Sequence, residues 1–256
     1  MPRLTVLGCA PGSPAADRNS SAYLLETDSG TYLLDCGEGV SRSILQLGKN
    51  PLSIGTILLS HTHPDHIAGL PLFLQMVYLL GRKDKLSIFL PEEARLGIRQ
   101  YLDLCYLFEE KLPFGIQLIP IEKNWKKEFA DFTISAFANR HLSGYREVLP
   151  SPRYFNQMQS FSFLFDFEVA RFYYSGDLFD LEDLKNLPDG VELLLVEGLH
   201  LPIEPLLAFC TERSVKKVVL THLAQKDFDA KEKWEAFGQK LGLDCRVAFD
   251  GMAVTF

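Results

Sequence analysis

The sequence lacks long apolar runs and has few cysteines. No stretch of its 256 residues approaches the roughly 20 consecutive apolar residues of a membrane span, and residues 1–8 contain too short an apolar segment for a signal peptide. The five cysteines are odd in number, scattered, and form no Cys-x-x-Cys pair. Neither a disulfide framework nor a thiolate zinc site is therefore expected. We predict a cytoplasmic protein that does not engage a membrane.

Positive charge is also scarce. Lys and Arg number 26 against 33 Asp and Glu, which gives a net charge of -7 and a pI of about 5.4. Because nucleic-acid binding depends on neutralising phosphates with Lys and Arg, this balance gives no general attraction to a long polyanion. The visible lysine clusters are interpreted as solvated surface; they are Lys83, Lys85, Lys123, Lys126, Lys127, Lys216 and Lys217. The apolar fraction of 47% is ordinary for a globular protein.

Histidine is scarce too, yet three of the six histidines lie in one short segment. Residues 58–70 read LLSHTHPDHIAGL, in which His61, His63, Asp65 and His66 form the pattern H-x-H-x-D-H. Imidazole and carboxylate groups suit zinc and similar divalent ions. Alternate positions leaving a strand, His61 and His63, can face one ion. Asp65 and His66, at the start of the next helix, can face a second. A lone histidine would more simply be a surface or core residue, but this clustering favours a metal site.

Further polar residues follow apolar, strand-like runs later in the chain, namely His141, Asp177, Glu197 and His222. Strand ends along one sheet edge are where open α/β folds place ligands and metals, so residues far apart in sequence can converge there. Counting donors gives two sets that share Asp177. The sets are His61, His63 and His141 for one ion, and Asp65, His66 and His222 for the other. Three protein ligands and a bridging carboxylate leave room for a water at each ion, as in catalytic sites. This arrangement predicts hydrolysis.

Clusters of predicted strands alternate with helices in both halves of the chain. The helices are expected at residues 40–47, 67–80, 92–107, 181–187, 205–212 and 230–241. This order predicts an α/β sandwich, two sheets covered by helices, rather than a purely parallel sheet. We predict a single domain over residues 1–256, made of two pseudo-symmetric halves with a polar seam near residues 122–130.

The motifs resemble those of the metallo-β-lactamase superfamily, and within it the RNase Z and phosphodiesterase branch. The similarity covers nearly the whole chain and rests on RNSS at 18–21, DCGEG at 35–39, H-x-H-x-D-H, GLP at 69–71, YSGD at 174–177, LTH at 220–222 and DG at 250–251. It implies a four-layer αββα sandwich, two zinc ions (with manganese or iron left open), phosphodiester cleavage and often a homodimer. The implied metal ligands are His61, His63, Asp65, His66, His141, Asp177 and His222. Asp65 would also orient the attacking water.

The resemblance also suggests residues for handling the substrate. RNase Z enzymes pair a further histidine with a glutamate to protonate the leaving group, and Glu197 with His200 resembles this pair at a compressed spacing. RNase Z enzymes that process tRNA usually carry a long Gly/Pro-rich arm, whereas residues 161–168 here turn directly into 171–175. In the loop 142–159 we expect Arg146 or Arg153 to contact a substrate phosphate. That these arginines only face water stays equally open.

The missing arm and the acidic balance favour a small or cyclic phosphodiester as substrate over an RNA end. A thioester or lactone hydrolase of the glyoxalase II kind is the alternative, since it uses nearly the same ligands. The chain ends 34 residues after His222, which is too short for the helical substrate module of that class. A β-lactamase would usually have Cys in place of Asp177, a di-iron reductase would have Glu in place of His63, and a non-enzymatic binder would have lost ligands. We predict a dinuclear metal-dependent phosphodiesterase.

Overall fold

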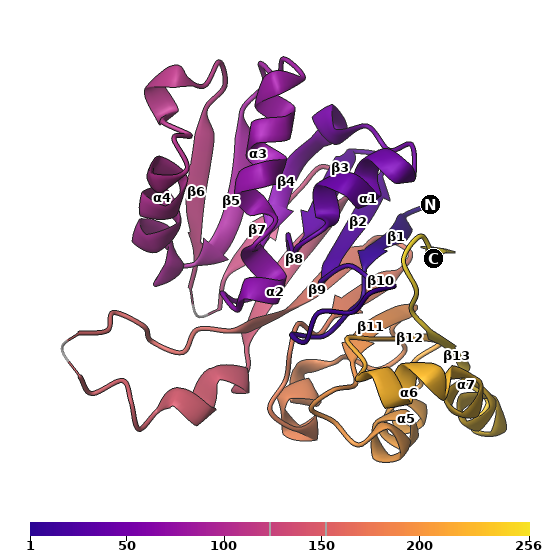
Figure 1. Cartoon of the computed structure of the whole chain (residues 1–256). Helices are drawn as coiled ribbons and strands as arrows, with labels where there is room; N and C mark the ends of the chain where they lie inside the picture. The colour runs from indigo at the N-terminus through magenta and orange to yellow at the C-terminus, as the bar shows by residue number, and fades with distance from the viewer. Residues whose placement is uncertain (123, 152) are drawn as a thin grey trace. The chain divides into compact units, whose positions relative to one another are not determined.

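The chain divides into two compact units, each built on one seven-stranded sheet (Figure 1). The computed structural model describes residues 1–122, 124–151 and 153–256. Lys123, in the predicted seam and lysine clusters, and Pro152, in the 142–159 loop, lie outside the described residues. Unit 1 comprises residues 1–122, 155–157 and 250–255, and unit 2 holds the other described residues. That the whole chain forms a single domain stays a prediction.

The sheet of unit 1 joins an antiparallel part to a parallel part. Its strand order is β14-β1-β2-β3-β4-β5-β6, in which β14 to β3 pair antiparallel and β3 to β6 pair parallel. The strands are β1 (Arg3–Gly8), β2 (Ala22–Thr27), β3 (Gly30–Leu34), β4 (Ile54–Leu58), β5 (Leu86–Pro91), β6 (Ile116–Ile121) and β14 (Ala253–Thr255). Parallel neighbours need crossover connections, and helices provide them.

Helices cover one face of this sheet (Figure 1). They are α1 (Val40–Gln46), α2 (Pro64–Ile67), α3 (Leu70–Leu79) and α4 (Ala94–Leu104), with short 3-10 turns at η1 (Pro51–Ser53) and η2 (Glu109–Lys111). Alternate strand residues, such as Ile57 and Leu59 around the end of β4, share one core cluster with Val40 of α1 and Phe73 of α3. Side chains two apart on a strand point to the same face, so this alternation fixes which face the helices cover.

The helix predicted over residues 67–80 is confirmed over residues 70–79, which form α3, but its start is wrong, because Ile67 ends the separate helix α2. The break falls at Ala68 and Gly69, before α3. A Cβ on Gly69 would lie 2.1 Å from the carbonyl oxygen of Gly37, so only glycine allows this approach. Pro71 occupies the first turn of α3, where its missing N–H is tolerated, whereas inside a continuous helix it would remove a hydrogen bond.

The sheet of unit 2 has the same plan of antiparallel followed by parallel pairing. Its order is β13-β12-β11-β10-β9-β8-β7, antiparallel from β7 to β10 and parallel from β10 to β13. The strands are β7 (Lys126–Glu128), β8 (Phe132–Ala138), β9 (Phe161–Phe167), β10 (Arg171–Tyr174), β11 (Leu193–Glu197), β12 (Lys217–Thr221) and β13 (Asp244–Val247). Strand β7 lies in the predicted polar seam and was not predicted as a strand. Its three side chains are all exposed, so no apolar pattern marks it.

Helices also cover one face of this second sheet (Figure 1). They are η4 (Leu181–Asn186), α5 (Ile203–Glu212), α6 (Gln225–Asp229) and α7 (Lys231–Lys240). The 3-10 turn η3 (His141–Tyr145) follows β8 and begins the loop after it. Leu194 and Val196 of β11 share a core cluster with Leu206 of α5 and Trp234 of α7. Two sheets with flanking helices confirm the predicted α/β class. Residues 168–170 join β9 to β10 directly, as predicted for a chain without the long arm.

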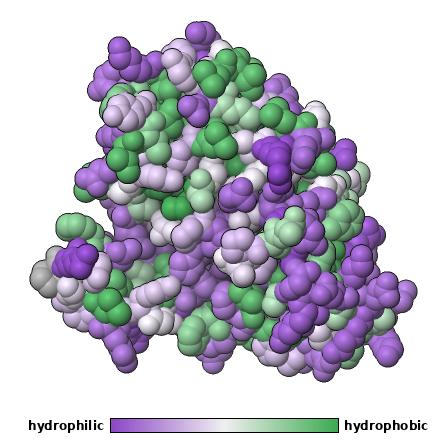
Figure 2. All heavy atoms as spheres, in the orientation of Figure 1, coloured by the Kyte–Doolittle hydropathy of each residue, from purple (hydrophilic) through white to green (hydrophobic). Residues whose placement is uncertain are grey.

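The surface in Figure 2 mixes polar and apolar side chains. Apolar patches lie over α3, whose exposed apolar residues include Leu72 and Leu79. Scattered exposed apolar side chains occur on every folded protein and need no special explanation. Among the helices that the structure describes, none combines the length and apolarity needed to cross a bilayer.

No disulfide forms among the five cysteines, all of which the structure describes. Cys105 is exposed and the other four are buried. Burial raises the pKa of the Cys210 and Cys245 thiols to about 12. Buried thiols with raised pKa values are poor nucleophiles and metal ligands. The four buried cysteines are therefore core packing residues, whereas Cys105 is on the surface.

Candidate metal centre

In unit 1 the H-x-H-x-D-H segment gathers its side chains just after strand β4. The ring centroids of His61 and His63 are 4.7 Å apart, and those of His61 and His66 are 4.1 Å apart. Nε2 of His66 lies 3.4 Å from Oδ2 of Asp65. His63 is extended, with φ -61° and ψ 146°, and caps helix α2, so the chain turns between the two pairs of donors. The structure brings together all four residues predicted from this motif.

A buried carboxylate orients the donors of unit 1. Asp35, which follows β3, accepts a hydrogen bond at its Oδ2 from Nδ1 of His66 at 2.7 Å. The same oxygen accepts from the Ser60 hydroxyl at 2.8 Å, and Oδ1 accepts from the Ser60 backbone N–H at 2.7 Å. The Ser60 hydroxyl also lies 3.0 Å from Nδ1 of His61. With Nδ1 engaged, His61 and His66 each offer Nε2 as the metal-binding atom, as in carboxylate–histidine–metal arrangements.

In unit 2 the three predicted donors converge on one carboxylate oxygen. Oδ2 of Asp177 lies 3.6 Å from Nε2 of His141 and 3.3 Å from Nε2 of His222. His141 begins η3 after β8, Asp177 follows β10, and His222 follows β12. The opposite nitrogen of His141, Nδ1, lies 3.4 Å from the carbonyl oxygen of Leu178, again leaving Nε2 as the metal-binding atom. His222 adopts a left-handed φ of 57°, which ends the strand and redirects the side chain.

Glu197 and His200, predicted as a pair, are in contact. Oε1 of the buried Glu197 lies 3.2 Å from Nδ1 of His200. The carboxylate also accepts backbone hydrogen bonds from Leu178, Leu199 and His200. The imidazole of His200 is 4.9 Å from that of His141 and 6.2 Å from that of His222, measured between centroids. Glu197 therefore fixes both the loop and the ring of His200 beside two candidate metal ligands, His141 and His222.

The two arginines predicted to contact substrate lie in the exposed part of the 142–159 loop. Arg146 follows η3, and Arg153 lies with its guanidinium carbon 5.7 Å from the centre of the Tyr154 ring. Both side chains are exposed. Their contact with a phosphate stays a prediction.

Asp35 and Ser60 hold the candidate ligands His66 and His61, and no motif in the sequence predicts this. Asp35 was used only as part of the DCGEG motif. It nevertheless follows an apolar strand, like His141, Asp177 and His222, and that signal could have identified it. Asn139 is a similar case in unit 2, since its Oδ1 accepts from the backbone N–H of His141 at 3.2 Å.

The donor chemistry of both sets fits divalent metal ions. Candidate ligands are His61, His63, Asp65 and His66 in unit 1 and His141, Asp177 and His222 in unit 2. Imidazole nitrogens with carboxylate oxygens are the ligands of catalytic zinc and related ions. The hydrogen bonds of His66 to Asp35 and of His141 to Leu178 orient these ligands as metal sites require.

Solved structures show the fold. YhfI, a metallo-β-lactamase fold protein from Bacillus subtilis, has a TM-score of 0.78 and 20% identity, covering 99% of this chain and 98% of that one. The short form of human tRNase Z has a TM-score of 0.70 and 20% identity, also covering 99% and 98%. The metallo-β-lactamase fold predicted from the sequence is confirmed.

Curated relatives agree with the branch predicted from the motifs. Ribonuclease Z of Methanosarcina acetivorans is 25% identical over 279 residues, 91% of this chain and 90% of that protein. Ribonuclease Z of Pseudomonas putida is 33% identical over 157 residues, 59% of this chain and 48% of that protein. Fold, relatives and donors together define a metal-dependent hydrolase of the RNase Z-like branch of the metallo-β-lactamase superfamily. More narrowly, residues 2–238 match the family described as Anti-Pycsar protein Apyc1, and the chain belongs to that family.

Proposed function

We propose that the donors of both units together hold two divalent ions, zinc in the first instance, with manganese or iron able to replace it. His61, His63 and His141 would hold one ion, and Asp65, His66 and His222 the other. Asp177 would serve both, and the observation that carries this assignment is its Oδ2, which faces two histidines at 3.3 and 3.6 Å. One carboxylate oxygen between two imidazoles is the geometry that a bridging ligand needs.

We propose that this centre hydrolyses phosphodiesters. Bound divalent ions would supply Lewis acidity and lower the pKa of water. Asp65 would orient the attacking water by accepting a hydrogen bond from it. His200 would give a proton to the leaving oxygen. Its Nδ1 is held by Glu197 at 3.2 Å, so Nε2 is the nitrogen that would face the substrate.

The substrate we propose is a small or cyclic phosphodiester, with an RNA end as the second candidate. The short connection between β9 and β10 supports the smaller substrate, because it leaves no arm in the place where tRNA-processing RNase Z enzymes usually carry one. The net charge of -7 supports it as well, since this balance gives no general attraction to a long polyanion. Arg146 or Arg153 would contact the phosphate.

A homodimer is expected from the resemblance. Light scattering on the protein as it elutes from a size-exclusion column would measure the oligomeric state.

The alternative is a thioester or lactone hydrolase of the glyoxalase II kind, because nearly the same donors serve that chemistry. Turnover separates the two functions. Protein freed of metal by a chelator and reloaded with zinc or manganese is assayed with bis(4-nitrophenyl) phosphate and with an aryl thioester. We expect diester turnover in the loaded protein, falling below about one hundredth after metal removal because water activation is lost. Thioester turnover alone would replace the proposal with the alternative, and turnover of neither would refute both.

A further inference from the structure

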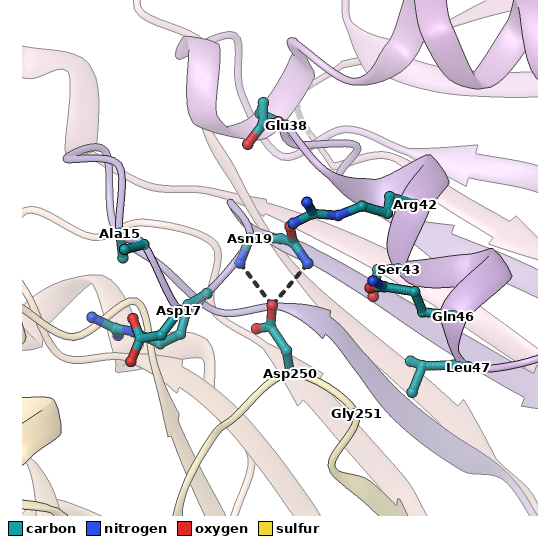
Figure 3. A pocket seen from close by; sticks show the side chains of 12 residues that line it. Ala15, Asp17, Asn19, Glu38, Arg42, Ser43, Gln46, Leu47, Asp250 and Gly251 are labelled. Carbon is teal, nitrogen blue, oxygen red and sulfur yellow. Dashed lines mark hydrogen bonds and ion pairs between the residues drawn. The ribbon is translucent and has the colours of Figure 1, made fainter.

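Asp250, near the end of the chain, is bonded to Asn19 in the loop after β1 (Figure 3). Its Oδ2 accepts hydrogen bonds from the backbone N–H of Asn19 at 2.7 Å and from Nδ2 of Asn19 at 2.9 Å. Its Oδ1 accepts from the Cys9 thiol at 3.4 Å. Burial raises the pKa of Asp250, and the hydrogen bonds from Asn19 oppose that rise. A partly buried carboxylate with three donors is a fixed anchor, not a mobile surface group.

Asn19 and the residues after it contact the segment that contains Gly37. The backbone N–H of Ser20 donates to the carbonyl oxygen of Glu38 at 3.1 Å, and that of Gly37 donates to Ser21 at 3.0 Å. A Cβ on Gly39 would lie only 2.1 Å from Oδ1 of Asn19. The two segments are therefore in direct contact.

The Gly37 segment in turn holds the backbone of the metal donors in unit 1. A Cβ on Gly37 would lie 2.3 Å from the carbonyl oxygen of Asp65. The backbone N–H of Cys36 donates to the carbonyl oxygen of His66 at 2.8 Å, and that of Gly69 donates to Cys36 at 2.9 Å. Tight packing of this kind transmits small displacements instead of absorbing them.

We infer that Asp250 is a positioning residue for Asp65 and His66, acting through Asn19 and the Gly37 segment. The inference rests on the proposed metal centre and makes it more specific. Loss of Asp250 weakens the ion held by Asp65 and His66. The ion held by His61 and His63 keeps its affinity, because those residues leave strand β4 before the supported turn.

The surroundings of Asp250 tolerate its replacement. Asp250 and Asn19 line a polar cavity of about 230 Å³ together with Glu38, Arg42 and Gln46 (Figure 3). Truncation of the side chain enlarges a space that already has polar walls, and water can occupy such a space. We therefore expect Asp250→Ala to fold.

The test is a titration of metal-free protein with cobalt(II), followed by its visible absorption. We expect two binding steps in the wild type. In Asp250→Ala the cobalt affinity of one step falls by about tenfold, the smallest effect usual for loss of a group that orients metal ligands. The absorption bands of that step also shift. Asp250→Asn restores affinity to within about twofold, because the amide oxygen can accept from Asn19. In the Asn19→Ala background, Asp250→Ala adds little, as expected for two members of one path. Asp28→Ala, in the exposed β2–β3 turn, is the matched control.

The outcomes separate the two hypotheses. Absence of cobalt binding in the wild type overturns the metal centre itself. If the wild type shows two binding steps and both keep their affinities in Asp250→Ala, the positioning role alone is overturned. Equal weakening of both steps, without rescue by Asp250→Asn, shows a general structural role and also overturns it. Should Asp250→Ala fail to fold, Asn19→Ser, which keeps the backbone N–H bonded to Asp250 but removes Nδ2, must weaken the same single step.

Discussion

Replacing Asp177 with alanine should lower kcat/KM for a phosphodiester by at least about 10³-fold, equivalent to about 4 kcal/mol of transition-state stabilisation. The expectation follows from the position of its Oδ2, 3.6 Å from Nε2 of His141 and 3.3 Å from Nε2 of His222. In the proposed centre Asp177 serves both ions, so its removal should affect both. Steady-state kinetics and metal content of the purified variant are the measurements.

The matched control for this substitution is Asp166→Ala, an exposed aspartate on β9 of the same sheet. It should leave both rate and metal content unchanged. Asp177→Asn keeps the shape of the side chain but removes its negative charge, so we expect a loss of kcat/KM between those of the wild type and Asp177→Ala. A rate for Asp177→Ala within tenfold of the wild type, with two metals still bound, would contradict the bridging role.

Replacing His200 with alanine should have an effect that depends on the leaving group. For a diester that releases an alkoxide, such as a cyclic nucleotide, we expect kcat to fall by about 10² to 10⁴, the usual contribution of a general acid. For bis(4-nitrophenyl) phosphate the fall should be at most a few-fold, because nitrophenolate is stable without a proton. The measurement is the ratio of the rates for the two substrates, determined with the same protein preparation.

Leu199→Ala is the control, since Leu199 is the exposed neighbour of His200 on the same loop. It should slow both substrates equally or not at all. If His200→Ala slowed the aryl and alkyl diesters by the same factor, His200 would not protonate the leaving oxygen. Its contact with Glu197 would then only hold the loop.

The candidate metal ligands could be picked out from sequence because their chemistry is rare in this chain. Three of six histidines share one segment, and the others follow strands. The contacts that orient the donors are not visible in the sequence, even where the residue itself follows a strand as Asp35 does. Asp35 acts on Ser60 and His66 from 25 and 31 positions away, and Asp250 reaches Asn19 across 231 positions. Such contacts exist only once the chain has folded.

Element boundaries failed where local pattern and tertiary structure disagree. Within the apolar run over residues 67–80, Gly69 and Pro71 mark the start of α3. The close approach of Gly69 to Gly37, which requires the break, exists only in the folded chain. Strand β7 has three exposed side chains and is defined by backbone pairing with β8. Apolar periodicity reports burial, so an exposed edge strand escapes it.

The most direct test of the account is the position of the metal ions themselves. Crystals of zinc-loaded protein would be measured by anomalous diffraction at the zinc absorption edge. We predict two peaks about 3.5 to 4 Å apart, one bound by His61, His63 and His141, the other by Asp65, His66 and His222, with Asp177 between them. No peak, or peaks whose ligands all come from one unit, would contradict it.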